Sequence, residues 1–81
     1  MKLPRDVSGA DLAKALRPLG YQITRQSGSH LRLTTEQRGQ HHVTVPNHDS
    51  IKIGTLAGIL ADVAGHFQIS REELVQQIFA S

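Results

Sequence analysis

The sequence predicts an α+β domain in which helices cover one face of a three-stranded antiparallel sheet. Apolar residues recur at helical spacing near both ends of the chain, and they alternate with polar residues between positions 21 and 46. Glycine-containing turns separate the alternating segments. The expected order is α-β-β-β-α-α, because a meander covered by helices on one face buries the apolar face of each strand.

One domain over residues 1–81 accounts for the chain, since a chain of this length leaves no room for a second hydrophobic core. The sequence contains no cysteine, which excludes disulfides and thiolate zinc sites, so an ordinary apolar core must stabilise the fold. No apolar run has the length of a signal peptide or a membrane span. We therefore expect a cytoplasmic protein that does not contact membranes.

The first helix is expected to begin at Ser8. Ser8 and Asp11 have the spacing of a capping box, in which the hydroxyl accepts a hydrogen bond from a first-turn amide. Apolar residues at positions 12, 15, 16 and 19 then form one stripe, and Gly20 is a suitable C-terminal cap. Pro18 removes an amide donor, so the last turn is expected to be broken or tightened.

Two strands follow, joined by a turn at residues 27–29. Tyr21, Ile23 and Arg25 alternate with polar residues, which predicts a half-buried strand with these three side chains on one face. Over residues 30–35 the two leucines point to one face. His30 and Arg32 therefore point to the other face, away from the apolar side.

A third strand and two further helices complete the domain. Residues 36–40 are expected to form a hairpin loop around Gly39, followed by a strand with Val43 and Val45 on one face. Apolar residues at positions 56, 59, 60, 63 and 67 predict a helix over residues 54–67. Ser70 and Glu73 match a second capping box, which begins a short C-terminal helix.

Charge is distributed unevenly along the chain. Residues 1–40 carry a net charge of +4 and residues 41–81 a net charge of −2, and the pI is near 9.5. A basic half suits a polyanion such as RNA, because neutralising phosphates supplies most sequence-independent affinity. A solvated surface is the alternative interpretation, since asymmetry of this size is also common by chance.

His30 is the strongest candidate for chemistry. It opens the second strand just after Gly28, where the missing side chain lets a phosphate or ribose approach the backbone. An imidazole titrates near neutral pH and is suited to move the proton of a ribose hydroxyl or of a leaving oxygen. The alternative is a surface histidine with no role.

The other histidines raise the question of a metal site. His41 and His42 are adjacent on a strand and point to opposite faces, so they cannot both bind one metal ion without distortion. We expect no metal site and no other cofactor. His48 lies in the loop before the long helix, where it either approaches a ligand or bonds loop carbonyls. Lys52 precedes that helix, whose first amides either hold a phosphate or are capped by Thr55.

Three motifs, in order, resemble the HicA toxins. Gly28-Ser29-His30 follows a helix and a strand, Val45-Pro46-Asn47-His48 ends the third strand, and Gly54-Thr55-Leu56 begins the long helix. The segment Leu3-Pro4-Arg5-Asp6-Val7-Ser8-Gly9 precedes them, so the resemblance spans nearly the whole chain. Pro18, and Ile53 where the family more often has a polar residue or proline, are mild departures.

The resemblance implies a fold, a reaction and a partner. HicA proteins look like reduced double-stranded-RNA-binding domains that cut messenger RNA, and the histidine of their glycine-serine-histidine motif is catalytic. That role passes to His30. The chain is then expected to be the toxin of a type II toxin-antitoxin system and a metal-independent endoribonuclease. Its expected partner is a HicB-type antitoxin that covers the active site, and no DNA contact by the toxin itself is expected.

The resulting hypothesis assigns each candidate residue a role. His30 activates the ribose 2′-hydroxyl or protonates the leaving 5′-oxygen, with Ser29 or His48 as the assisting group. The residues expected to bind RNA are Gly28, Ser29, Arg25, Arg32, Lys52 and His48. A non-catalytic RNA-binding module of the same fold and a protein-interaction module without RNA are the two alternatives.

Overall fold

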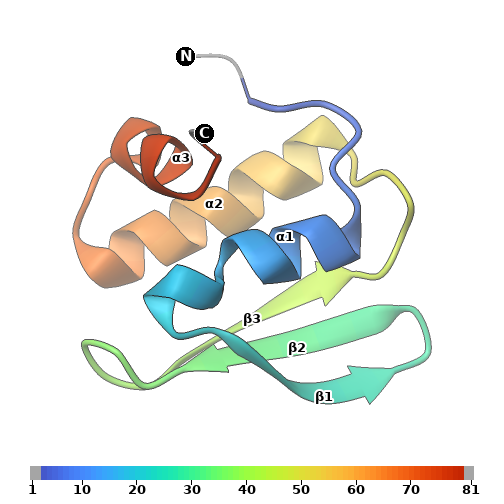
Figure 1. Ribbon diagram of the computed structural model, residues 1–81, viewed down its shortest axis with the longest axis horizontal. Helices are drawn as coiled ribbons and strands as arrows, with labels where there is room; N and C mark the ends of the chain where they lie inside the picture. The colour runs from blue at the N-terminus through green and yellow to red at the C-terminus, as the bar shows by residue number, and fades with distance from the viewer. Residues whose placement is uncertain (1–2, 80–81) are drawn as a thin grey trace.

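The computed structural model describes residues 3–79, which form two layers, a sheet and a group of helices on one of its faces (Figure 1). The elements in chain order are α1 (Gly9–Ala15), the 3₁₀ turn η1 (Arg17–Leu19), β1 (Gln22–Ser27), β2 (His30–Thr35), β3 (His41–Pro46), α2 (Ile53–Phe67) and α3 (Arg71–Phe79). The α+β class, the order of the elements and the one-sided cover of the sheet confirm the sequence prediction. Within the described residues, no helix is long and apolar enough to cross a membrane.

The sheet is an antiparallel meander with the strand order β1-β2-β3. Leu31 pairs with Val45 and Leu33 pairs with Val43, so the apolar residues of the two strands share the face that the helices cover. This inner face is the one predicted from the alternation of residue types. The opposite, helix-free face is called the outer face below.

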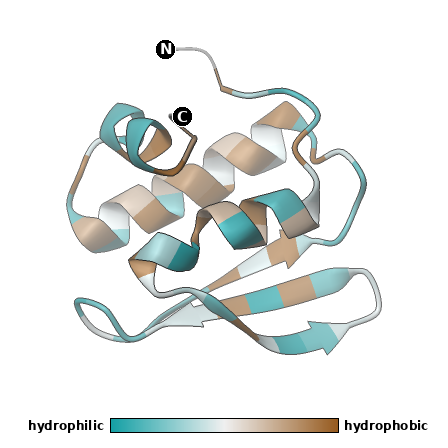
Figure 2. Ribbon diagram, viewed as in Figure 1, coloured by the Kyte–Doolittle hydropathy of each residue, from teal (hydrophilic) through white to brown (hydrophobic). Residues whose placement is uncertain are grey.

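The hydrophobic core lies between the sheet and the helices (Figure 2). Its completely buried aliphatic side chains come from both layers: Leu12, Leu16, Leu33, Val45, Leu56, Leu60, Val63 and Leu74. Burial of one such side chain stabilises the fold by about 1.5–3 kcal/mol relative to its exposure. The core therefore draws on α1, β2, β3, α2 and α3 together.

The first helix begins and ends as predicted. The Ser8 hydroxyl accepts a hydrogen bond from the Asp11 N–H at 2.9 Å, and the Ser8 N–H donates to the Asp11 carboxylate at 3.2 Å. Both halves of the capping box are thus present. Pro18 lies in the 3₁₀ turn, which confirms the tightened last turn, and Gly20 ends it with a φ of +85°.

The two later helices begin differently from one another. α2 begins at Ile53, with Lys52 as the N-cap and no side chain bonded to the first-turn amides. Thr55 lies inside the first turn, so the prediction that Thr55 caps this helix is wrong, because a cap must precede the helical residues. α3 has the predicted start, since the Ser70 hydroxyl accepts a hydrogen bond from the Glu73 N–H at 3.0 Å.

The prediction that the first strand is half-buried is wrong. Every residue of β1 is exposed, and Ile23 remains 50% exposed, because the helices pack on β3 and leave β1 largely uncovered. The pairing also contains a bulge: Ile23 pairs with Leu33, but Arg25 pairs with Arg32. The extra residue turns Arg25 to the outer face. Arg25 and Ile23 therefore lie on opposite faces, contrary to the prediction that they share one.

Candidate nucleic-acid interface

His30 is the first residue of β2 and is exposed to solvent. Its cross-strand partners are Ser27 on β1 and Pro46 on β3. Since Leu31 and Leu33 point into the core, His30 and Arg32 lie on the outer face, as predicted. None of the described helices covers this face, so an extended ligand can reach the imidazole (Figure 1).

The turn that carries His30 depends on Gly28. Ser27 pairs with His30, so Gly28 and Ser29 form a two-residue connection, and Gly28 has a φ of +54°. A hairpin turn with glycine at its first central position has this conformation. The space around Gly28 is open, so backbone conformation and not crowding favours glycine at this position. The same open space leaves the backbone accessible to a ligand.

The loop after β3 is attached to both the turn and the first helix. The Asn47 N–H donates to the Ser29 carbonyl at 2.6 Å, and the Gly9 N–H donates to the His48 carbonyl at 3.0 Å. A Cβ on Gly9 would overlap the Pro46 carbonyl oxygen, so α1 approaches the end of β3 directly. These contacts bring His48, whose side chain is exposed, to the same end of the sheet as His30.

Two arginines face each other on the outer face. Arg25 and Arg32 are direct cross-strand partners, and both are exposed. Like charges in this position destabilise a sheet. In residues 3–79 the one ion pair joins His41 and Asp62, so no carboxylate offsets the two arginines. An anionic ligand bound here would remove an unfavourable interaction.

Lys52 has a different environment. It is the N-cap of α2, in the helical layer, and its side chain is exposed. The Ile51 N–H donates to the Val7 carbonyl at 2.7 Å, which holds this part of the loop beside the N-terminal segment. The structure therefore does not place Lys52 on the outer face with His30 and Arg32.

A chain of hydrogen bonds crosses all three strands on the outer face. The hydroxyls of Thr24 and Thr34 are 2.8 Å apart, and the Thr34 hydroxyl lies 2.7 Å from the His42 Nδ1. Sequence reasoning did not find this chain, because the bulge at Thr24 sets which side chain of β1 meets Thr34. The chain links side chains of the three strands beside the arginine pair.

A second group of ring side chains lies at the other end of the sheet. The Tyr21 hydroxyl is 2.7 Å from the His41 Nδ1, and the His41 Nε2 is 3.2 Å from the Asp62 Oδ1. The His41 ring also stacks on the His66 ring with centroids 4.5 Å apart. His41 pairs with Thr35, at the far end of β2 from His30, roughly 17 Å away at the usual rise of a strand.

Burial and the nearby negative charge of Asp62 together raise the pKa of Tyr21 to about 12, with burial the larger cause. Sequence reasoning considered His41 only as a metal ligand. Its ring bonds Tyr21 and Asp62, whereas the His42 ring bonds Thr34 on the outer face, which confirms that the two histidines point in opposite directions. In residues 3–79 no three His, Asp or Glu side chains gather as a metal site would require.

The fold and the outer face define a small α+β domain whose open sheet face carries a histidine and an arginine pair. Residues 9–64 match the family model described as "HicA toxin of bacterial toxin-antitoxin", which is more than half of the chain. The chain belongs to the HicA toxin family, as its motifs predicted. The match includes all three strands and ends within α2, so α3 lies beyond it. Membership of this family implies an antitoxin as partner.

Comparisons with curated proteins and with solved structures found no match.

Proposed function

We propose that this toxin is an endoribonuclease that cleaves messenger RNA on the outer face of its sheet, with His30 as the catalytic residue. One observation carries the proposal. An exposed imidazole opens β2 two positions from Arg32, which forms a like-charged pair with Arg25. An RNA backbone supplies the negative charge that this pair lacks, and it presents a ribose hydroxyl to an imidazole, a group suited to accept its proton.

The proposed reaction is transfer of a phosphodiester within the RNA. His30 accepts the proton of a 2′-hydroxyl, the 2′-oxygen attacks the adjacent phosphorus, and the bond from phosphorus to the 5′-oxygen breaks. The products are a 2′,3′-cyclic phosphate and a 5′-hydroxyl, and the leaving oxygen takes up a proton. One imidazole cannot accept and donate in the same step. Ser29 and His48, which lie at the same end of the sheet, are the proposed assisting residues.

The residues around His30 bind the RNA backbone in this proposal. Arg25 and Arg32 bind phosphates on the outer face, and the open space at Gly28 lets the chain approach the turn. Lys52 and the uncapped first-turn amides of α2 bind a phosphate farther along the RNA, outside the outer face. Acid–base catalysis of this kind needs no metal, so cleavage should continue in the presence of EDTA.

The proposal extends to the partner and the setting. The antitoxin is of the HicB type and covers His30 when it binds, as expected for the protein antitoxin of a type II system. The toxin acts in the cytoplasm, where messenger RNA is available, and makes no DNA contact of its own.

Expression in cells tests the role of His30. Wild type and His42→Ala should stop growth and degrade messenger RNA, whereas His30→Ala should do neither while remaining folded. His42 is the matched control because it is also an outer-face histidine, paired with Thr34 four residues along β2 from His30. RNA degradation by folded His30→Ala would refute the proposal.

Purified protein tests the reaction itself. RNA with methylated 2′-oxygens should resist cleavage, and ordinary RNA should yield the cyclic phosphate. His30→Lys supplies a positive charge but no imidazole to accept the proton, so it should bind RNA but not cleave it. Binding without cleavage by the wild type would instead favour the non-catalytic RNA-binding module.

A further inference from the structure

A groove of about 620 Å³ lies between α1 and the edge strand β1. Its apolar lining includes Ala10 and Ala13 from α1, Ile23 from β1 and Leu31 from β2. Ile23 is 50% exposed although it faces the helical side of the sheet. The groove is therefore an apolar surface that this chain does not cover, and it opens on the opposite side of the sheet from His30.

One wall of the groove is an unpaired strand edge. Within residues 3–79, β1 pairs only with β2, so its other edge presents backbone N–H and C=O groups that these residues leave free. An extended segment can add to such an edge by backbone hydrogen bonds, with alternate side chains entering the neighbouring groove. The bulge at Thr24 twists this edge, so the paired stretch must be short.

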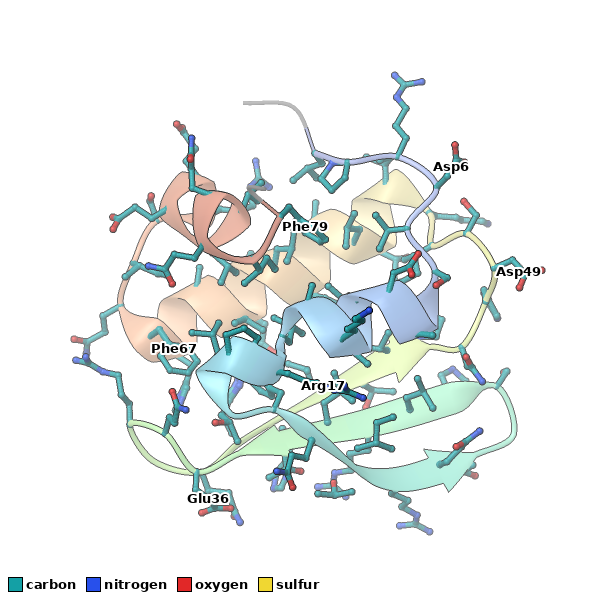
Figure 3. The ribbon with its side chains drawn as sticks, in the orientation of Figure 1. Asp6, Arg17, Glu36, Asp49, Phe67 and Phe79 are labelled. Atoms are coloured by element: carbon teal, nitrogen blue, oxygen red, sulfur yellow. The ribbon has the colours of Figure 1, made fainter. Side chains whose placement is uncertain are left out.

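The charges at the groove indicate the chemistry of the segment. Lys14 and Arg17 line it, both are exposed, and none of its lining residues is acidic. In the part of the chain that the structure describes, neither of the two forms an ion pair with a carboxylate. Figure 3 shows Arg17 between the first helical segment and the sheet. An occupant with carboxylates beside its apolar side chains complements this wall.

Two other occupants fit the groove less well. A second copy of the chain, paired edge to edge, would add a second set of the cations Lys14, Arg17 and Arg25 to the same edge, and like charges oppose that contact. Single-stranded RNA binds grooves by stacking bases on exposed aromatic rings. Tyr21, the aromatic residue of the lining, is only 1% exposed.

We propose that the groove between α1 and β1 binds an acidic, extended segment of a partner protein. The segment adds to β1 as a short fourth strand, places an apolar side chain against Ile23, and directs carboxylates toward Lys14 and Arg17. This surface is separate from the outer face, so the proposal does not depend on RNA cleavage.

A titration of the full chain, followed by the NMR signals of its backbone amides, tests the proposal. The probe is a synthetic peptide of about six alternating glutamate and valine residues, the usual length of a strand. The peptide should shift the amide signals of the protein in α1 and β1, and it should slow amide exchange along β1. A peptide in which lysine replaces glutamate should bind at least about tenfold more weakly, since rim charges at an interface act by complementarity.

Charge variants sharpen the test. Arg17→Glu should weaken binding of the acidic peptide at least about tenfold, whereas Arg71→Glu, the same change at an exposed position outside the groove, should not. His30→Ala should bind the peptide as the wild type does, which separates this proposal from the catalytic one.

Four results would overturn the proposal. These are an absence of binding, amide shifts confined to the outer face, equal binding of the lysine peptide, and a dimer of the chain that Ile23→Glu abolishes.

Discussion

Gly9 is the residue at which the absence of a side chain most directly shapes the site. It is buried, it donates its N–H to the His48 carbonyl, and it leaves no room for a Cβ beside the Pro46 carbonyl. The glycine thus lets the start of α1 contact the end of β3. Through this contact, α1 holds the loop that lies next to the His30 turn.

Replacement of Gly9 by alanine should lower the free energy of unfolding by about 1–3 kcal/mol, because the new methyl group forces α1 away from β3. Gly58→Ala is the control, since Gly58 lies inside α2 with open space around it. That substitution should raise stability by about 0.5–1 kcal/mol through helix propensity. Urea denaturation of both variants measures the difference, and equal effects would contradict the packing argument.

At the scale of elements, the contact between Tyr21, His41 and Asp62 joins the start of β1, the start of β3 and α2. Tyr21 is buried and contributes its ring to the core, whereas its hydroxyl bonds the His41 ring. The His41 ring in turn bonds Asp62 of α2. The three side chains therefore attach the long helix to the end of the sheet that is far from His30.

The burial of Tyr21, with the nearby charge of Asp62, makes the stability of the protein depend on alkaline pH. The pKa of Tyr21 rises from its ordinary value of 10.0 to about 12 in the folded chain. Between pH 10 and 12 the unfolded chain has lost the phenol proton while the folded chain keeps it, so the free energy of unfolding falls as the pH rises. The contribution of the protonated Tyr21 phenol to the free energy of unfolding is complete below pH 10 and is lost by pH 12.

Tyr21→Phe should remove this alkaline loss of stability. At neutral pH it should cost about 0.5–1.5 kcal/mol, because the His41 Nδ1 loses its hydrogen-bond partner. Since Tyr21 is the single tyrosine of the chain, ultraviolet absorbance during a pH titration reports its ionisation directly. A midpoint near pH 10 in the folded protein would contradict the assignment.

At the scale of the whole molecule, the two faces of the sheet have different surroundings. The inner face packs on the helices, and the outer face exposes His30 and the arginine pair. The bulge in β1 affects both faces, because it lets Ile23 stay on the inner side while Arg25 turns outward. The arginine pair costs some stability in the free protein, and in the proposed function it binds the phosphates of the RNA.

Replacement of Arg25 or Arg32 by glutamine tests this exchange of stability for binding. Each variant should gain a few tenths of a kcal/mol to about 1 kcal/mol in the free energy of unfolding, because the like-charge contact disappears. RNA affinity should fall, and the slope of log K against log salt should decrease by roughly 0.7 for each lost phosphate contact. Unchanged RNA affinity in both variants would contradict an RNA site on the outer face.

The sequence by itself determined the features that depend on neighbouring residues. Caps, apolar periodicity and the alternation along β2 and β3 are local effects, so they predicted the class of the fold, the start of α1 and the outward orientation of His30. The ordered motifs predicted the HicA family, and the match over residues 9–64 confirmed it.

Tertiary structure decided what depends on residues far apart in the chain. The packing of the helices on β3 left Ile23 on β1 exposed, and the bulge, which only the pairing with β2 defines, turned Arg25 outward. The contact between Tyr21, His41 and Asp62 joins positions about 20 residues apart, which no local period encodes. Such contacts depend on where the chain returns in space, and the packing of the core sets that path.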